Sequence, residues 1–131
     1  MASLWQEREK QLLALRERAK RGGGEARMNK QRAAGKLTAR ERLTLLFDPD
    51  TFVEIGELVE SRIDDFGMDE RRVPGDGVVI GYGRVNGRTV CASSEDFTVI
   101  GGTLGEYHSQ KICRIMDMAI DMKCPFVLIN D

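Results

Sequence analysis

The most constraining feature of the chain is a pair of strand-like segments separated by two residues. Residues 78–85 read Val-Val-Ile-Gly-Tyr-Gly-Arg-Val, and residues 88–93 read Arg-Thr-Val-Cys-Ala-Ser. The Asn-Gly pair at 86–87 favours a type I′ turn, because both central positions of that turn need a positive φ. The pattern therefore predicts a β-hairpin. Gly81 and Gly83 predict either a bend or the close approach of another backbone segment to the first strand.

A helix and another strand are predicted after the hairpin. Residues 104–123 repeat apolar residues at helical spacing, and Pro125 stops that helix. Residues 126–129, Phe-Val-Leu-Ile, are typical of a strand buried on both faces. Strand, helix and strand form a βαβ crossover, so we expect parallel strands and an α/β fold. The residues expected close to one face of this helix are His108, Ile112, Ile115, Ala119 and Met122.

The first 35 residues predict a helical arm. Ser3 and Gln6 have the spacing of a capping box at the start of a helix over residues 3–21, and three glycines then end it. A weaker helical segment follows over residues 25–34. We therefore expect a basic arm with a glycine hinge, residues 1–35, and a body, residues 36–131. The expected apolar face of the first helix consists of Leu4, Leu12, Leu15 and Ala19.

The body begins with a third predicted helix. Thr38 and Glu41 form a clear capping box, and Pro49 ends the helix because proline cannot continue its hydrogen bonds. Residues 52–55 predict a short strand. Residues 64–77 predict a polar loop, which is either functional or merely a connector. The apolar face of this helix consists of Leu43, Leu46 and Phe47.

Charge is unevenly distributed along the chain, although the formal net charge is only −1. Residues 1–42 carry 12 Lys or Arg and 5 Asp or Glu, whereas residues 43–131 carry 8 and 16. A basic arm of this kind suits nucleic acid, anionic lipid, a phosphate-rich cofactor or an acidic protein surface. Composition alone does not choose among these partners.

Composition also bears on location. No apolar run approaches the ~20 residues that cross a bilayer, and the first twenty positions are rich in Glu and Arg. We therefore expect neither a membrane span nor a secretory signal. Cys91, Cys113 and Cys124 are too widely spaced for a disulfide framework or a zinc site, so we expect small core residues in a cytoplasmic protein.

Few residues carry recognisable chemistry by themselves. The glycines at 101–102 precede a helix, so they form either an anion-binding turn or simply a tight turn. His108, the single histidine, has no nucleophile at suitable spacing and is interpreted as a helix-face residue. Glu95 and Asp96 are either paired carboxylates or a solvated strand end or cap. The phosphate-loop and dinucleotide-binding fingerprints are absent. A basic cluster consists of Lys30, Arg32, Lys36, Arg40 and Arg42.

Three ordered motifs resemble one known family. They are Gly-Lys-Leu-Thr-Ala-Arg-Glu-Arg-Leu at 35–43, Pro-Gly-Asp-Gly-Val-Val-x-Gly-Tyr-Gly at 74–83, and Asp-Phe-Thr-Val-x-Gly-Gly at 96–102. In these motifs the chain resembles the N-terminal portion of the carboxyltransferase (β) subunit of biotin-dependent acyl-CoA carboxylases. The motif at 96–102 favours the propionyl-CoA carboxylase type and the related methylmalonyl-CoA decarboxylase subunit. The resemblance extends over essentially the whole chain.

The resemblance implies a fold and an activity. The fold is a partial crotonase-like ββα spiral preceded by the helical arm. The activity is transfer of a carboxyl group from carboxybiotin to a short acyl-CoA such as propionyl-CoA, with the biotin carried by a partner protein or domain. Further implied partners are a biotin carboxylase or biotin carrier subunit and other carboxyltransferase subunits in a homo-oligomer. In relatives the sequence continues with Ser-Gly-Gly-Ala-Arg, whose glycines hold the thioester oxyanion, so we expect the 131 residues alone to be inactive.

The resemblance also implies site residues. It assigns no catalytic residue and no metal ligand to this chain. Lys36, Arg40 and Arg42 are candidates for contact with the phosphates of CoA. The residues expected to border the acyl-CoA pocket are Phe97, Thr98, Val99, Gly101, Gly102 and Thr103.

Two hypotheses from other classes remain. The chain could be a non-catalytic interaction module that docks on a full-length carboxyltransferase through its basic arm and an exposed sheet edge. It could also bind nucleic acid through the arm. The basic cluster has no interleaved aromatic residues, which weakens the nucleic-acid hypothesis.

Overall fold

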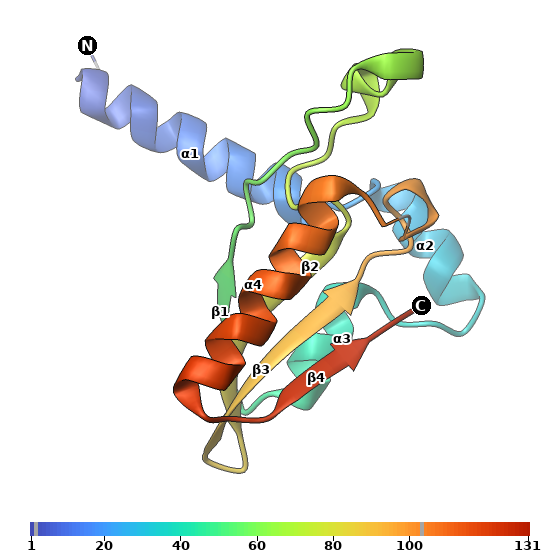
Figure 1. The fold of residues 1–131 in the computed structure, drawn as a ribbon. Coiled ribbons are helices and arrows are strands. Elements are labelled where there is room, and N and C mark those ends of the chain that lie inside the picture. Colours follow the sequence, from blue (N-terminus) through green and yellow to red (C-terminus); the bar gives the residue numbers. More distant parts are fainter. Residues whose placement is uncertain (2, 103) are drawn as a thin grey trace.

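A four-stranded mixed sheet organises the chain in the computed structural model, which describes residues 1, 3–102 and 104–131. The strand order is β1-β2-β3-β4, with antiparallel pairing of β1 with β2 and of β2 with β3, and parallel pairing of β3 with β4. Helix α4, Glu106–Met122, makes the crossover between the two parallel strands (Figure 1). The predicted α/β fold and βαβ unit are therefore confirmed. The strands are β1, Val53–Ile55; β2, Val78–Val85; β3, Arg88–Glu95; and β4, Phe126–Ile129.

The predicted hairpin is confirmed, with β2 and β3 paired along their full lengths. Asn86 and Gly87 have φ values of 50° and 78°, as a type I′ turn requires. The carboxylate of Asp48 accepts hydrogen bonds from both of their amides, at 3.0 and 2.9 Å. The turn is thus fixed by its own sequence and by Asp48, which lies just after the third helix.

The two glycines of β2 allow the close approach that the sequence predicts. A Cβ atom on Gly81 would lie 2.2 Å from the carbonyl oxygen of Val53 in the adjacent strand. A Cβ atom on Gly83 would lie 2.7 Å from a ring carbon of Phe47. Larger residues at either position would push β1 or the Phe47 ring away from the sheet.

Helices cover the two faces of the sheet and make two separate cores. Because side chains alternate along a strand, Val78 and Ile80 face α4, whereas Val79 faces the helix α3, Ala39–Leu46. The α4 core also contains Cys91, Ile115 and Ala119. The α3 core also contains Ala39, Leu43, Phe47, Val90 and Ala92.

The helical arm forms as predicted but packs less than expected. Helix α1, Leu4–Lys20, begins at Ser3 with both hydrogen bonds of the capping box, and α2, Glu25–Ala33, follows the glycines. Helix α1 extends away from the sheet (Figure 1). Leu4 is 66% exposed and only Ala19 is buried in this helix, so the apolar face that these residues share is largely uncovered. Leu12 and Leu15 are exposed as well.

The predicted loop is confirmed, and two expectations, for β4 and Cys113, are corrected. The loop at 64–77 contains two short 3₁₀ turns, Asp65–Gly67 and Asp69–Arg71. Strand β4 is not buried on both faces, because Leu128 is 47% exposed at the edge of the sheet. Cys113 is exposed because it lies on the side of α4 away from the sheet. Met122 shares the face of Ile115 but is exposed, as the last residue of the helix.

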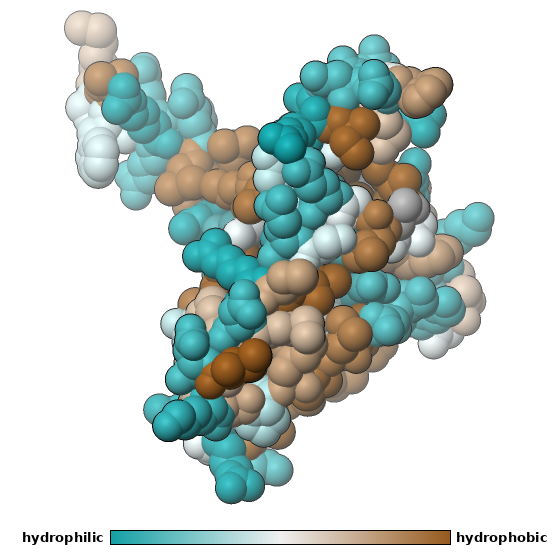
Figure 2. Space-filling model, in the orientation of Figure 1, coloured by the Kyte–Doolittle hydropathy of each residue, from teal (hydrophilic) through white to brown (hydrophobic). Residues whose placement is uncertain are grey.

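The outer surface of α4 is partly apolar. Figure 2 shows hydrophobic residues gathered over the lower middle of the molecule, where α4 and β4 lie in Figure 1. The large exposed hydrophobic residues of α4 and β4 are Met116, Ile120, Met122 and Leu128. Within the described part of the chain, no helix combines the length and the apolar character that a membrane crossing needs.

Candidate functional site

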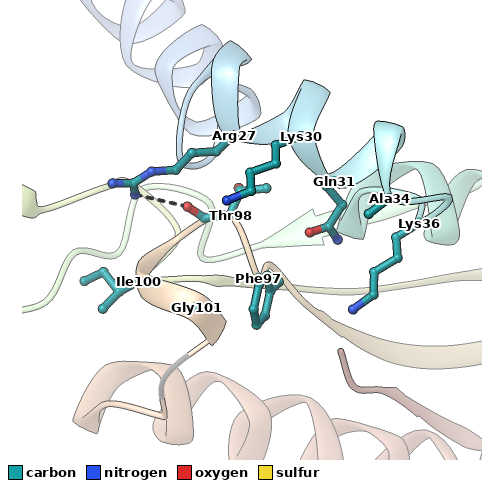
Figure 3. Close-up of a pocket in the computed structure, with 9 residues that line it drawn as sticks. All are labelled: Arg27, Lys30, Gln31, Ala34, Lys36, Phe97, Thr98, Ile100 and Gly101. Atoms are coloured by element: carbon teal, nitrogen blue, oxygen red, sulfur yellow. Dashed lines mark hydrogen bonds between the residues drawn. The ribbon is translucent and has the colours of Figure 1, made fainter.

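The main candidate site is a pocket of about 400 Å³ between α2 and the loop after β3 (Figure 3). It lies beyond the carboxyl end of β3, where ligand sites of α/β sheets are usually found. Helix α2 and the segment after it supply one wall, and residues 97–101 supply the other. The lining residues are Arg27, Lys30, Gln31, Ala34, Lys36, Phe97, Thr98, Ile100 and Gly101.

The loop wall of the pocket is shaped by Asp96. Its Oδ1 atom accepts hydrogen bonds from the Thr98 amide at 3.0 Å and from the Thr98 hydroxyl at 2.5 Å. The Asp96 amide in turn donates to Gly77 O at 2.8 Å. Of the two interpretations of this carboxylate, the structure supports a cap. Gly101 and Gly102 follow with φ values of 64° and 70°, which glycine adopts without strain.

The glycine hinge packs directly against this loop. The Gly23 amide donates to the Thr98 hydroxyl at 3.0 Å. A Cβ atom on Gly23 would lie 1.8 Å from Thr98 O, and one on Gly22 would lie 2.3 Å from Asp96 Oδ2. Glycine is therefore required here for contact as well as for chain direction. The sequence shows where α1 ends, but not that its end lies against the pocket loop.

The pocket is cationic on the arm side. Arg27 donates from its guanidinium to Thr98 O at 3.3 Å, which leaves its other N–H groups available. The Lys30 side chain makes no hydrogen bond or ion pair with any residue that the structure describes. Lys36 places its ammonium 5.2 Å from the centroid of the half-exposed Phe97 ring, a cation–π contact. Such a lining suits a ligand that combines negative charge with an apolar or planar part.

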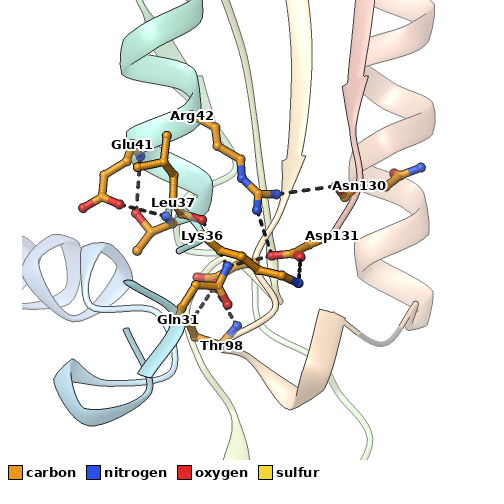
Figure 4. Close-up of polar contacts among 10 residues, drawn as sticks. Gln31, Lys36, Leu37, Glu41, Arg42, Thr98, Asn130 and Asp131 are labelled. Atoms are coloured by element: carbon orange, nitrogen blue, oxygen red, sulfur yellow. Dashed lines mark hydrogen bonds and ion pairs between the residues drawn. The ribbon is translucent and has the colours of Figure 1, made fainter. Parts of the chain in front are cut away.

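A carboxylate at the margin of the pocket gathers three side chains (Figure 4). Asp131 Oδ2 accepts from the Gln31 side-chain amide at 2.6 Å and pairs with Arg42 at 3.1 Å. Its Oδ1 pairs with Lys36 at 2.7 Å. The side chain of Asp131 is 4% exposed. The hydrogen bond from Lys36, helped by Gln31 and Arg42, lowers the pKa of Asp131 below its usual value.

The predicted pocket residues fall into three groups. Phe97, Thr98 and Gly101 line the pocket together. Val99 is buried behind the loop, near Gly77, and does not line it. Gly102 follows Gly101 outside the lining, and Thr103 lies outside the described residues.

The three predicted phosphate-binding cations do not stay together. Lys36 lines the pocket, whereas Arg42 reaches only its margin through Asp131. Arg40 is separated from both, because its guanidinium makes a bidentate pair with Glu54 of β1 and lines another hollow along α3. The sequence reasoning missed five lining residues, Arg27, Lys30, Gln31, Ala34 and Ile100. For the first four, the spacing of three and four residues along one helix face was the available signal.

The conspicuous titratable residues of α4 lie in the core and not in the pocket. His108 is fully buried, with Nδ1 3.0 Å from Asp76 O and Nε2 3.8 Å from a carboxylate oxygen of Glu95. Lys111 donates to Gly75 O at 2.7 Å and to Val78 O at 2.5 Å. Burial lowers the pKa of Lys111 to about 8. Both residues hold the segment before β2 against α4, which supports a structural role for His108.

The cysteines are divided between the core and the surface. The Cys91 and Cys124 sulfur atoms lie 3.5 Å apart beside the α4 core, and burial, helped by Cys124, raises the pKa of Cys91 to about 12. Cys113 is exposed, so the expectation that it is a core residue is wrong. Among the described residues, no group of three or more His, Cys, Asp or Glu side chains is arranged to hold a metal ion.

Sequence comparison identifies similar proteins. The carboxyl transferase domain model matches residues 30–131. The chain is 56% identical over 110 residues to the methylmalonyl-CoA decarboxylase subunit alpha of Propionigenium modestum, covering 84% of this chain and 21% of that protein. It is 54% identical over 112 residues to the mitochondrial propionyl-CoA carboxylase beta chain of Homo sapiens, again covering 84% and 21%. The chain thus spans about a fifth of the length of these relatives.

Structural comparison agrees. The crystal structure of transcarboxylase 12S with methylmalonyl-coenzyme A bound matches with a TM-score of 0.94 and 46% identity, over 100% of this chain and 26% of that one. A single-chain long-chain acyl-CoA carboxylase matches with a TM-score of 0.79 and 26% identity, over 91% and 13%. The predicted partial crotonase-like fold with its helical arm is therefore confirmed. On both kinds of evidence, the chain belongs to the carboxyl transferase domain family.

Proposed function

We propose that the chain provides the CoA-binding part of a carboxyltransferase that moves a carboxyl group between carboxybiotin and a short acyl-CoA such as propionyl-CoA. The observation that carries the proposal is the pocket between α2 and residues 97–101. This pocket brings cations from the arm onto an aromatic ring and a glycine-rich loop that the family resemblance independently assigns to the substrate. Membership of the carboxyl transferase family supplies the reaction class.

The lining matches the chemistry of coenzyme A. CoA carries several phosphate charges on a long, partly apolar chain with a planar adenine. Arg27 and Lys30 offer N–H donors to phosphate oxygens, since charge-assisted hydrogen bonds of this kind are the strong ones. Phe97, Ala34 and Ile100 offer apolar surface to the remainder. We place Phe97, Thr98 and Gly101 against the substrate, and we keep Arg40 out of the site because Glu54 occupies its guanidinium.

For the substrate, we propose only that the acyl chain of the acyl-CoA is short. The two relatives named above are 56% and 54% identical to this chain, and one is named as a decarboxylase subunit and the other as a carboxylase chain. These identities do not favour either direction of carboxyl transfer. A subunit of a methylmalonyl-CoA decarboxylase is therefore the second candidate function, and it would use the same pocket.

Biotin is proposed to arrive on a partner. Its ureido ring is uncharged and carboxybiotin carries a single carboxylate, whereas the pocket lining presents three cations, Arg27, Lys30 and Lys36. The lining therefore matches the several phosphate charges of CoA better than it matches biotin, and we derive no step through biotin in this chain. A biotin carboxylase or biotin carrier subunit and further carboxyltransferase subunits are the partners that we propose. A cytoplasmic location stays a prediction.

Calorimetric titration of the 131-residue chain with CoA, dephospho-CoA and pantetheine tests the pocket. We expect CoA to bind most tightly and pantetheine most weakly, because each loses phosphate contacts relative to the one before. Lys30→Met should weaken CoA binding about fivefold or more, the cost of one charge-assisted contact. Lys10→Met, on exposed α1 outside the pocket, is the matched control and should change affinity by less than about twofold. Equal affinity for the three ligands, or equal effects of the two variants, would overturn the proposal.

A further inference from the structure

The cations around the pocket belong to two classes. Lys36 and Arg42 are both ion-paired with Asp131, whereas the ion pairs among the described residues include neither Arg27 nor Lys30. The sequence does not distinguish these classes, since all four are basic residues within residues 27–42. Asp131 makes the distinction, although it lies about a hundred positions further along the chain.

We infer that Asp131 is a positioning residue that withholds Lys36 and Arg42 from phosphate and so leaves Arg27 and Lys30 as the phosphate-binding pair of the pocket. The inference rests on the proposed CoA site and names the subsite within it. It also revises the phosphate contacts that the sequence suggested, because Lys36 and Arg42 become parts of the pocket frame.

An existing ion pair explains why a ligand phosphate would gain less at Lys36 than at Lys30. The Asp131 carboxylate is satisfied by Gln31, Lys36 and Arg42 together, and its side chain is 4% exposed although that of Lys36 is half-exposed. A phosphate that recruited Lys36 would have to break the 2.7 Å pair with Asp131, so part of the new interaction would be offset. Lys30 has no such commitment, so a phosphate gains its full interaction there. The lowered pKa of Asp131 keeps the carboxylate charged throughout the neutral range.

The same contact fixes the direction in which Arg27 and Lys30 point. Residues 27, 30, 31 and 34 lie on one face of α2, since helical neighbours are three and four positions apart. Gln31 on this face donates to Asp131 after β4 and to Leu37 O at 3.1 Å. This hydrogen bond holds the orientation of the helix together with the contacts of Arg27 with Thr98 O and of Arg32 with Glu41. Arg27 and Lys30 are thereby aimed across the pocket at residues 97–101 (Figure 3).

Lys36 acquires a different role from this arrangement. Its ammonium lies both on Asp131 and over the Phe97 ring, at 2.7 Å and 5.2 Å respectively. It therefore closes one end of the pocket and covers one face of Phe97. The aliphatic part of the side chain contributes most of that wall, so Lys36→Met preserves the wall while removing the charge.

A set of charge variants titrated with CoA tests the inference. Lys30→Met should weaken binding about fivefold or more, while Lys36→Met should weaken it less than about twofold. In the Asp131→Asn background Lys36 is released, so adding Lys36→Met there should weaken binding about threefold or more. Asp121→Asn, on the exposed side of α4, is the control background and should leave the Lys36→Met effect small.

The outcomes separate this inference from the proposed function. If CoA does not bind the unaltered chain, the CoA site itself is wrong. If CoA binds and Lys36→Met is as damaging as Lys30→Met in the unaltered chain, the site stands and the role of Asp131 is refuted. Should Asp131→Asn fail to fold, NMR of the lysine ammonium groups decides: CoA should shift the Lys30 signal and leave that of Lys36 in place. A shift of Lys36 equal to that of Lys30 would overturn the inference.

Discussion

Two helices of the same length, α1 and α4, are stabilised in different ways. Each has 17 residues and acidic residues in its first turn, but α1 buries only Ala19. Helix α4 buries four residues, His108, Lys111, Ile115 and Ala119, against the sheet. Their N-termini differ as well, because α1 is capped by its own Ser3 and α4 by Asp76, which accepts from the His108 amide at 3.0 Å.

The comparison shows what local sequence can achieve without packing. A capping box and good helix formers suffice to define α1, which contacts the remainder mainly near its C-terminal end, through Arg16 with Glu57 and Arg18 with Arg72 O. Helix α4 is stabilised by burial, and its start depends on a residue from a distant loop. Changes in α4 should therefore affect global unfolding, whereas changes in α1 should affect the helix alone.

The largest expected effect distinguishes the packing of the two helices. Ile115→Ala removes a fully buried side chain from the α4 core and should reduce the free energy of unfolding by about 2–5 kcal/mol. Leu12→Ala on α1 should reduce it by less than about 0.5 kcal/mol, because Leu12 is exposed. Urea unfolding followed by circular dichroism measures both. Similar losses for the two variants would show that α1 packs as closely as α4.

The second prediction concerns the buried Lys111 of α4. Its pKa is about 8 in the folded chain and an ordinary 10.5 when unfolded, so the unfolded state binds more protons between these values. The contribution of Lys111 should therefore raise stability as pH rises from 8 to 10.5, by about 3 kcal/mol in total, and should be constant below pH 8. Urea unfolding from pH 7 to 10 should show this slope as the difference between the unaltered chain and Lys111→Met. Parallel pH curves for the two proteins would contradict it.

The smallest expected effect concerns the two helix starts. Asp76→Ala removes the acceptor for the His108 amide and places alanine at a φ of 49°, so the free energy of unfolding should fall by about 1–2 kcal/mol. Ser3→Ala should fray the first turn of α1 and change the free energy of global unfolding by less than about 0.5 kcal/mol. Hydrogen exchange of the two first turns separates local fraying from global loss. Faster hydrogen exchange of the sheet amides in Ser3→Ala would contradict the contrast between α1 and α4.

Elements with strong local signals were predictable from the sequence. The Asn-Gly turn with its two strands and the capping boxes at Ser3 and Thr38 form as expected. The burial of these elements was less predictable. Periodicity placed Leu4 on one face with Ala19 and Met122 on one face with Ile115, yet Leu4 and Met122 are both exposed. A repeat shows which residues share a face and not whether anything covers that face.

The candidate site was predictable mainly on its loop side, with Lys36 as the one predicted residue of the opposite wall. Phe97, Thr98 and Gly101 belong to one contiguous motif and line the pocket together. Arg27 could not be placed there, because its contact with Thr98 O joins residues 71 positions apart. The glycine hinge was visible as a break in the helix, whereas its contact with Thr98 depends on how the arm folds back.

The sequence by itself determined the secondary structure, the α/β class and the family resemblance, because these depend on short-range patterns of turn residues, caps and hydrophobic spacing. The tertiary structure decided which of the basic residues face the pocket unpaired. Lys36, Arg40 and Arg42 have similar sequence surroundings, yet Asp131 binds two of them and Glu54 binds the third. The physical reason is that the charge a cation presents to a ligand depends on the anions packed beside it, and folding brings these anions from distant positions in the chain.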